Sequence, residues 1–220
     1  MAYGLANTCA RRTKVDLGAV VRRTVDLLVS LVMLVILLVP ILLIALAVRA
    51  DDCGPALLRQ ERVGLGRNRF TLLKFRTMFQ GGDDSAHREL IARELRGENT
   101  VVAGSSKLHG DRRVTRVGAF LRRTSLDELP QLINVLRGDM TLVGPRPCLD
   151  WEADMFPAEY DSRFDVPPGL TGLWQVSGRS QLQTLEMLKL DVEYVDTRSL
   201  RSDLGILLRT PMTLLRSGAR

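Results

Sequence analysis

The chain has 220 residues, a length that suffices for one domain of ordinary size. Of these residues 45% are apolar and 25% charged, and this composition is too apolar for a disordered tail. Three widely spaced cysteines exclude a disulfide framework, and two histidines without CxxC or HxxxH spacing argue against structural zinc. The net charge is +6, with 27 arginines against four lysines. Because guanidinium groups bind phosphate well, we expect an acidic partner: phospholipid, a phosphorylated substrate or nucleic acid.

A long apolar run near the N-terminus is the first feature along the chain. Leu27–Val48 carries no charge and is interrupted only by Ser30 and Pro40. As a helix it would reach about 33 Å, enough for a hydrocarbon core of about 30 Å. The run is too long for a signal peptide, and no cleavage site follows it. We therefore expect a retained membrane segment.

The sequence around the run leaves its path through the membrane open. Arginine and lysine are frequent on both flanks, so charge gives no preferred orientation. Pro40 lacks an N–H group and its ring clashes with the carbonyl of Ile36, so we expect a kink there. Two half-helices meeting at Pro40 would form a re-entrant hairpin that enters and leaves by one leaflet. A single-pass anchor is the alternative, because spanning helices also tolerate proline.

The remaining segments predict a mainly helical α+β domain. Two alternating stretches, 57–63 and 69–75, flank a glycine-containing turn and predict a β-hairpin over about 57–77. Apolar periodicity and turn residues predict the other elements. Helices are expected at 84–96, 116–123, 127–137, 184–195 and 200–215, and irregular chain at 97–110, 144–147 and 167–172. The last helix is basic and amphipathic, which fits either an anionic membrane surface or packing on its own domain.

An acidic pair stands where the 127–137 helix is expected to begin. Asp127 and Glu128 follow Ser125, whose spacing to Glu128 is that of a capping box. Pro130 favours Asp127 as the N-cap, because the third helical position needs no N–H donor. In either case the helix dipole would favour ionised carboxylates. An ionised carboxylate can also serve as a nucleophile or a magnesium ligand, so capping and catalysis both stay open.

Arginines are unusually dense around the acidic pair. Arg146 lies between two prolines, which restrain its backbone and lower the entropy lost when it binds phosphate. A DNA-binding patch is the rival interpretation. The apolar run, the 5% aromatic content and the lack of a nucleic-acid motif weaken it.

Three blocks in this order closely resemble the bacterial sugar transferase family, the small monotopic polyprenyl-phosphate glycosyl-1-phosphate transferases. The central block is Asp127–Met140, continuing into Leu142–Pro147. Lys74–Met78 and Pro168–Arg179 resemble two further family blocks. The resemblance covers roughly 25–215, and three long ordered blocks are far more specific than one short motif.

The resemblance implies a fold and a division of the chain. It implies a re-entrant membrane helix broken at Pro40, a β-hairpin, and a helical catalytic core with interfacial amphipathic helices. Residues 1–50 would form the basic N-terminal segment and membrane helix, and 51–220 a catalytic domain on the cytoplasmic face of the bacterial inner membrane. One departure is the valine before Pro40, where some relatives have serine.

The resemblance also implies the site residues. Asp127 would be the nucleophile, and Glu128 would hold Mg²⁺ as the cofactor. Phosphate-binding roles fall on four arginines, and three further positions are looser candidates. The arginines are Arg112, Arg122, Arg146 and Arg179, and the other candidates are Lys74, Arg76 and Asp191.

The implied reaction is transfer of a sugar 1-phosphate from a UDP-sugar to polyprenyl (undecaprenyl) phosphate, through a phosphosugar-aspartate, with release of UMP. It would be the first membrane step of a glycoconjugate pathway producing exopolysaccharide, O-antigen or a glycoprotein glycan. The expected partners are the two substrates and inner-membrane phospholipid, without nucleic acid, and homo-oligomer formation stays open. The alternative function is a single-pass membrane scaffold or signalling domain without catalysis.

Overall fold

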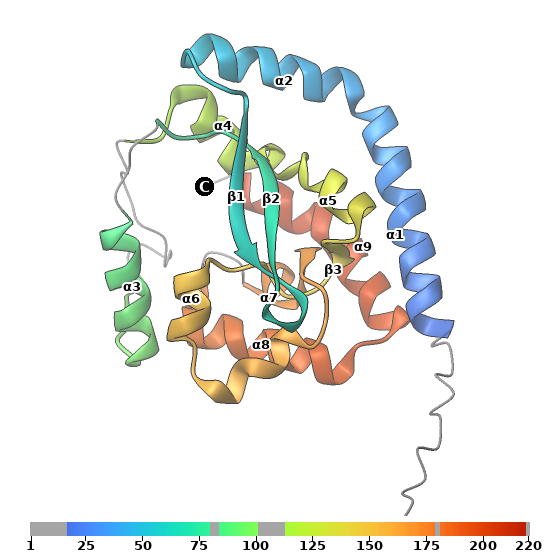
Figure 1. Cartoon of the computed structure of the whole chain (residues 1–220), viewed down its shortest axis with the longest axis vertical. Helices are drawn as coiled ribbons and strands as arrows, with labels where there is room; N and C mark the ends of the chain where they lie inside the picture. The colour runs from blue at the N-terminus through green and yellow to red at the C-terminus, as the bar shows by residue number, and fades with distance from the viewer. Residues whose placement is uncertain (1–16, 80–83, 101–112, 179–180, 219–220) are drawn as a thin grey trace, which may run out of the picture.

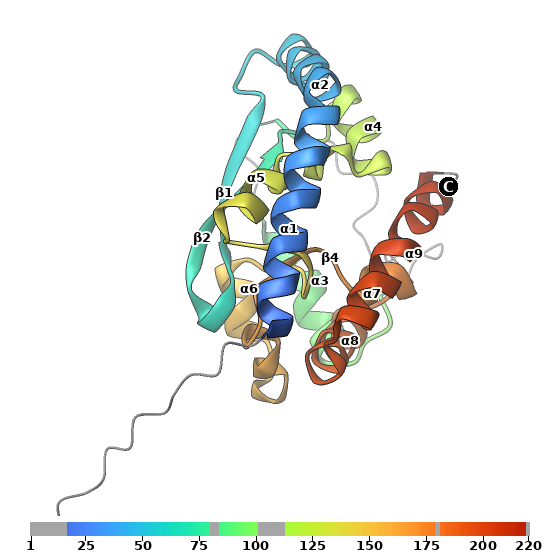
Figure 2. The ribbon, with the colours of Figure 1, turned by 90° about the vertical axis from the view of Figure 1, so that its right-hand side faces the viewer.

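The computed structural model describes residues 17–79, 84–100, 113–178 and 181–218. The fold is mainly helical with two small two-stranded sheets, as the α+β prediction expects, and the longer hairpin lies along the outside of the helices (Figures 1 and 2). The helices are α1 (Leu17–Ile36), α2 (Leu38–Asp51), α3 (Ser85–Leu95), α4 (Arg116–Thr124), α5 (Gln131–Arg137), α6 (Asp150–Met155), α7 (Leu173–Ser177), α8 (Thr184–Thr197) and α9 (Leu200–Gly218). The strands are β1 (Leu57–Val63), β2 (Arg69–Phe75), β3 (Thr141–Val143) and β4 (Gly169–Thr171). Short 3-10 helices are η1 (Leu65–Arg67), η2 (Leu126–Glu128) and η3 (Ala158–Phe164).

The apolar N-terminal run forms the bent pair of helices α1 and α2, which meet at an angle of 64°. By length and composition this pair could enter or cross a membrane, whereas no single helix in the described ranges could cross one. The break lies at Leu37, which corrects the prediction that the half-helices meet at Pro40. Pro40 cannot donate to Ile36, so α1 ends at Ile36 and Pro40 occupies the first turn of α2. The N–H of Ile41 then bonds to the carbonyl of Leu37, at 2.8 Å.

Polar contacts attach the first half of α1 to the rest of the fold. Arg23 donates to the carbonyls of Val135 and Leu136 at the end of α5, at 2.6 and 2.9 Å. The buried Asp26 carboxylate accepts from the N–H of Leu142 in β3, at 3.0 Å. Figures 1 and 2 show α1 along one side of the domain and α2 across its top. Most of the α2 surface is apolar and exposed.

Strands β1 and β2 form the predicted hairpin with the predicted boundaries. They pair antiparallel from Leu57 opposite Phe75 to Val63 opposite Arg69. The hairpin is fastened to α5 by Asn134, whose side chain is fully buried. Its Oδ1 accepts from the N–H of Leu73 at 3.0 Å, and its Nδ2 donates to a carbonyl of β2 at 2.7 Å. These bonds place β2 beside the segment that carries the acidic pair.

The main hydrophobic core joins β2, α5, β3, α8 and α9. Its buried residues include Leu72, Val135, Met140, Tyr194 and Ile206. Strands β3 and β4 pair in parallel across this core, with Thr141 opposite Gly169 and Val143 opposite Thr171. The prediction that all of 167–172 is irregular is therefore wrong for Gly169–Thr171, because the pairing partner lies 28 positions earlier in the chain.

The expected helices α3, α4, α8 and α9 are confirmed, while α6 and α7 were not predicted. The turn 144–147 is irregular as expected, and most of the expected loop 97–110 lies outside the described residues. Helix α9 packs Ile206 into the core and leaves an apolar row exposed, consisting of Leu204, Leu208 and Met212.

Candidate active site

The acidic pair sits on a short turn between two helices. Helix α4 ends at Thr124, and Ser125 adopts a left-handed backbone with φ of 58°. Asp127 and Glu128 then lie in the single 3-10 turn η2, and α5 begins only after Pro130. The proline ring would clash with the carbonyl of Leu126 in a continuous helix, so the chain cannot be α-helical through the pair.

This geometry corrects two expectations about the pair. The predicted helix 127–137 begins at Gln131, and neither Ser125 nor Asp127 caps it, because Pro130 occupies the N-cap position. The helix dipole was expected to favour ionised carboxylates. Instead, burial and the neighbouring Glu128 carboxylate raise the pKa of Asp127 to about 6.

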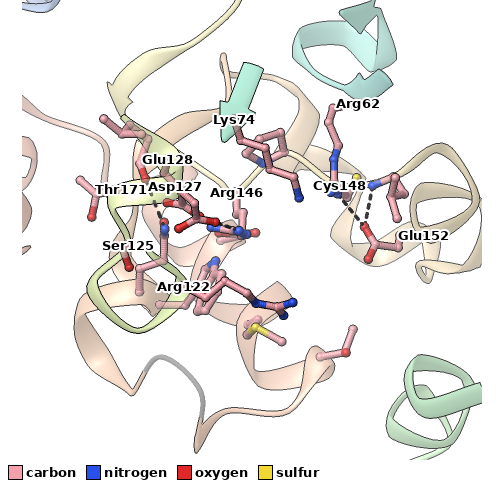
Figure 3. A pocket seen from close by; sticks show the side chains of 18 of the residues that line it. Arg62, Lys74, Arg122, Ser125, Asp127, Glu128, Arg146, Cys148, Glu152 and Thr171 are labelled. Atoms are coloured by element: carbon pink, nitrogen blue, oxygen red, sulfur yellow. Dashed lines mark hydrogen bonds and ion pairs between the residues drawn. The ribbon is translucent and has the colours of Figure 1, made fainter. Parts of the chain in front are cut away.

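A cavity of about 650 Å³ opens beside the pair. Figure 3 shows basic side chains from separate segments gathered around the two carboxylates. Arg122 comes from the last turn of α4, Lys74 from β2, and Arg146 from the proline-rich turn after β3. The cavity also extends to β4, α7 and α9, which contribute less polar walls, including Leu170, Trp174, Thr210 and Leu214.

Glu128 and Arg146 form an ion pair at the centre of the site. The Nη2 of Arg146 lies 2.8 Å from Oε1 of Glu128, and the carboxylate raises the pKa of the guanidinium further. The Arg146 side chain lines the cavity and is still 46% exposed, so a ligand in the cavity can reach it. Both residues were predicted from the sequence to belong to the site, and in the structure their side chains are in contact.

Lys74 lines the same cavity. Burial, followed by the positive charges of Arg62 and Arg146, lowers its pKa to about 8, while Asp127 and Glu128 oppose that shift. In return, Arg146, Lys74 and Arg122 each lower the pKa of Asp127 and partly offset the effect of its burial. At neutral pH the centre therefore holds two carboxylates and three cations, which suits an anionic phosphorylated ligand.

Two of the looser candidates form buried ion pairs with other side chains, and of these two only Asp191 lines the cavity. Arg76 does not line the cavity: its guanidinium is 5% exposed and pairs with the Asp52 carboxylate at 2.8 Å, which ties the end of β2 to the end of α2. Asp191 of α8 is 3% exposed in the cavity wall and forms a buried ion pair with Arg163 at 2.8 Å. Burial raises the pKa of Asp191 to about 6.

Arg112 and Arg179, the remaining two candidates, lie outside the described residues. Sequence reasoning did not identify Arg62 or Arg163 as site residues. Arg62 lies on the same face of the hairpin as Lys74, because Lys74 pairs with Leu58 and side chains alternate along a strand, so the predicted hairpin could have indicated it. Arg163 stands in the unpredicted 3-10 helix η3, where no sequence signal marked it.

The fit of this site to a metal ion rests on two carboxylates. Within the described ranges no group of three or more histidine, cysteine or acidic residues could hold an ion. Mg²⁺, however, is commonly bound by one or two carboxylates together with substrate phosphates and water. Asp127 and Glu128 supply that donor set, so these residues fit Mg²⁺ that binds with a phosphorylated substrate.

Comparison with known proteins gives related sequences over nearly the whole chain. A glucose-1-phosphate transferase of Caulobacter vibrioides, named for UDP-glucose and undecaprenyl phosphate, is 44% identical over 215 residues, covering 93% of this chain and 72% of that protein. The undecaprenyl-phosphate galactose phosphotransferase of Salmonella typhimurium is 37% identical over 98% of this chain, which spans only 44% of that protein. The exopolysaccharide production protein ExoY of Rhizobium meliloti is 37% identical, with 92% and 89% covered.

The sequence pattern that defines a known enzyme family matches residues 17–217. The match includes the bent helix pair, the hairpin and every described residue of the cavity. It confirms the predicted resemblance and the expectation of a transferase. The chain therefore belongs to the bacterial sugar transferase family, whose relatives are named as sugar phosphotransferases.

Proposed function

We propose that the chain transfers a sugar 1-phosphate from a UDP-sugar to undecaprenyl phosphate or a similar polyprenyl phosphate, and releases UMP. The names of the Caulobacter and Salmonella relatives supply the two substrate classes. One observation carries the proposal: Asp127 and Glu128 share a cavity with Arg122, Arg146 and Lys74. That arrangement combines a nucleophile with cations that can bind a diphosphate.

Asp127 is the nucleophile in this proposal. Its carboxylate attacks the phosphorus that bears the sugar, the bond from that phosphorus to the UMP oxygen breaks, and UMP leaves with the bonding electrons. The sugar phosphate stays on Asp127 as an acyl phosphate. An oxygen of polyprenyl phosphate then attacks the same phosphorus, and the carboxylate is released as the polyprenyl diphosphate sugar forms. Glu128 is less suited to attack, because Arg146 holds one of its oxygens.

The basic residues account for much of the proposed rate enhancement. Negative charge accumulates on phosphoryl oxygens in both steps, and catalysis of phosphoryl transfer depends mainly on positioning and electrostatic stabilisation. Arg146 and Arg122 would bind the diphosphate, and Lys74 would add a third positive charge beside Asp127. Glu128, together with Asp127, would hold Mg²⁺, which when bound would neutralise charge on the diphosphate oxygens.

The bent pair α1–α2 supports a monotopic attachment to the cytoplasmic face of the inner membrane. In this proposal α2 and the adjoining end of α1 enter the inner leaflet and the chain returns to the same side, with 51–220 as the catalytic domain. The exposed row on α9 would rest on the lipid surface, with Arg201 and Arg209 near anionic headgroups. This attachment brings a soluble nucleotide sugar and a lipid phosphate together at one plane.

The proposed place in metabolism is the first membrane step of a bacterial glycoconjugate pathway. The name of the Rhizobium relative points to exopolysaccharide as the product of that pathway. Purified protein in detergent or nanodiscs, assayed for UMP release over a panel of UDP-sugars with undecaprenyl phosphate and Mg²⁺, tests the proposal. Acceptor-dependent UMP release from at least one donor is expected. No release from any donor would contradict it.

A further inference from the structure

Arg163 is a fully engaged buried side chain that the reaction above does not use. It is 5% exposed, and its Nε and Nη2 both donate to Oδ2 of Asp191, at 3.2 and 2.8 Å. The same Nη2 donates to the backbone carbonyl of Arg146 at 2.8 Å, and Nη1 contacts the thiol of Cys148 at 3.2 Å. One guanidinium therefore holds the chain on both sides of Pro147.

The other backbone anchors of this turn lie at its ends, and the Arg146 side chain itself pairs with Glu128. The N–H of Gly144 bonds to the carbonyl of Thr171, and the carbonyl of Pro145 accepts from Gly169, both at 2.9 Å. At the far end, the carbonyl of Cys148 accepts from the N–H of Val63, also at 2.9 Å. Between these ends, the backbone carbonyl of Arg146 is held by Arg163.

Arg163 is itself fixed in place from several sides. Its guanidinium lies 5.1 Å from the ring centre of Phe156 and 5.0 Å from that of Phe164, in addition to its ion pair with Asp191. Such a planar, multiply bonded group has little freedom to reorient, and lysine could not reproduce its fork of donors. A rigid support of this kind can transmit its position to the residue that it holds.

We propose that Arg163, anchored by Asp191, is a positioning residue that sets the place of the Arg146 guanidinium through the Arg146 backbone. This inference rests on the proposed function, in which Arg146 binds substrate phosphate. It also gives Asp191 a role different from direct substrate binding. Because a displacement of about 1 Å in a reacting group can cost a hundredfold in rate, the support is expected to affect turnover.

A double-mutant cycle tests the coupling. Arg163→Lys keeps the positive charge beside Asp191 but loses the fork, and we expect kcat/KM for the UDP-sugar to fall about tenfold to a hundredfold. In an Arg146→Met background the same change should cost less than about twofold, since the group that Arg163 positions is gone. An equal loss in both backgrounds would overturn the inference.

Arg76→Lys is the matched control. Arg76 is equally buried, also pairs with an aspartate carboxylate at 2.8 Å, and also donates to a backbone carbonyl, at 2.7 Å, but does not line the cavity. Its effect on kcat/KM should be the same with Arg146 present or replaced. Should Arg163→Lys be too unstable to purify, Asp191→Asn takes its place in the cycle, with the same expected loss of effect in the Arg146→Met background.

Hydrogen exchange gives a readout that does not depend on activity. Arg163→Lys should speed amide exchange in peptides covering 141–149, whereas Arg76→Lys should not. Unchanged exchange there would overturn the inference even if the wild-type protein is active. Failure of the wild-type protein to release UMP would instead contradict the proposed function, while the exchange data still decide whether Arg163 anchors the turn.

Discussion

Glu128 and Arg146 lie 18 positions apart in the sequence, and their side chains meet at 2.8 Å beside the cavity of the candidate active site. This ion pair divides two adjacent carboxylates into different environments. Glu128 is held by a guanidinium, whereas burial and its neighbour raise the pKa of Asp127 to about 6. Separating the properties of paired carboxylates is a common way to give them different chemical roles.

Replacing Asp127 with asparagine tests its role in catalysis. We expect Asp127→Asn to lower UMP release by about a thousandfold or more, because the amide cannot form the acyl phosphate. The exposed Asp154, which does not line the cavity, provides the control Asp154→Asn, which should retain activity. Turnover near the wild-type level in Asp127→Asn would contradict the assignment.

The same variant tests the electrostatic strain at the site. The pKa of Asp127 is about 6 in the folded state against 3.8 as the ordinary value, so the free energy of unfolding falls as the pH rises from about 3.8 to about 6 and stays lowered above that. Asp127→Asn removes that loss of stability. Its melting temperature relative to wild type should therefore be higher at pH 7.5 than at pH 4.5, as measured by scanning fluorimetry at both values.

Glu128→Gln is expected to change the pH dependence of the donor half-reaction. The negative charge of Glu128 raises the pKa of Asp127, so its removal should lower that pKa and move the acidic limb of kcat/KM below pH 6. The rate at the plateau should also fall, because Arg146 loses its partner. An acidic limb that stays in place would show that the limb does not belong to Asp127.

The magnesium requirement of the same variant is a separate measurement. If Glu128 holds Mg²⁺, Glu128→Gln should need a clearly higher Mg²⁺ concentration for half-maximal UMP release. The control is Glu159→Gln, because Glu159 is exposed and does not line the cavity, whereas Gln60 does line it. The same Mg²⁺ dependence in Glu128→Gln and wild type would remove Glu128 from the metal site.

Lys74 should produce the alkaline limb of the pH profile. Its pKa is about 8, so wild-type activity is expected to decline above pH 8 as the positive charge beside Asp127 is lost. Lys74→Arg keeps the charge and should remove this limb, although the larger side chain can lower the rate. Lys189→Arg, on the exposed face of α8, should leave the profile unchanged. Persistence of the limb in Lys74→Arg would contradict the assignment.

Two native cysteines flank the bent helix pair and report its topology. Cys9 precedes α1, and the exposed Cys53 follows α2. In variants that retain only one of these two cysteines, an impermeant maleimide applied to spheroplasts should label neither of them until the membrane is opened.

Pro40→Ala restores the N–H donor to the carbonyl of Ile36 and should favour a straight helix, which would expose Cys9 on the outside in a fraction of molecules. Labelling of Cys9 from outside in the protein that keeps its native Pro40 would show a spanning helix.

Local patterns predicted the elements that depend on local physics. Alternation and a glycine-containing turn gave both strands of the hairpin, and apolar periodicity gave the long helices α8 and α9. The break in the N-terminal run was expected from Pro40. The break lies at Leu37 because Pro40 has no N–H to donate to the carbonyl of Ile36, and α1 therefore ends at Ile36.

Other features depend on contacts that no local pattern contains. Strands β3 and β4 have three residues each and form only because they pair across the core. Lys74 and Arg76, two positions apart, were expected together at the site, but β2 ends at Phe75 and Arg76 turns to Asp52. The raised pKa of Asp127 likewise comes first from burial and then from the Glu128 carboxylate, and burial depends on the packing of the whole fold and not on a local pattern.

The central claim is that Asp127 carries the sugar phosphate during turnover. Wild-type protein is incubated with an active UDP-sugar and Mg²⁺ but no polyprenyl phosphate, quenched in acid and analysed by mass spectrometry of the tryptic peptide 124–137. We predict the added mass of one sugar phosphoryl group on Asp127, absent from Asp127→Asn and removed when undecaprenyl phosphate is added before the quench. An unmodified peptide from protein that turns over rapidly with acceptor, or an adduct on another residue, would contradict the claim.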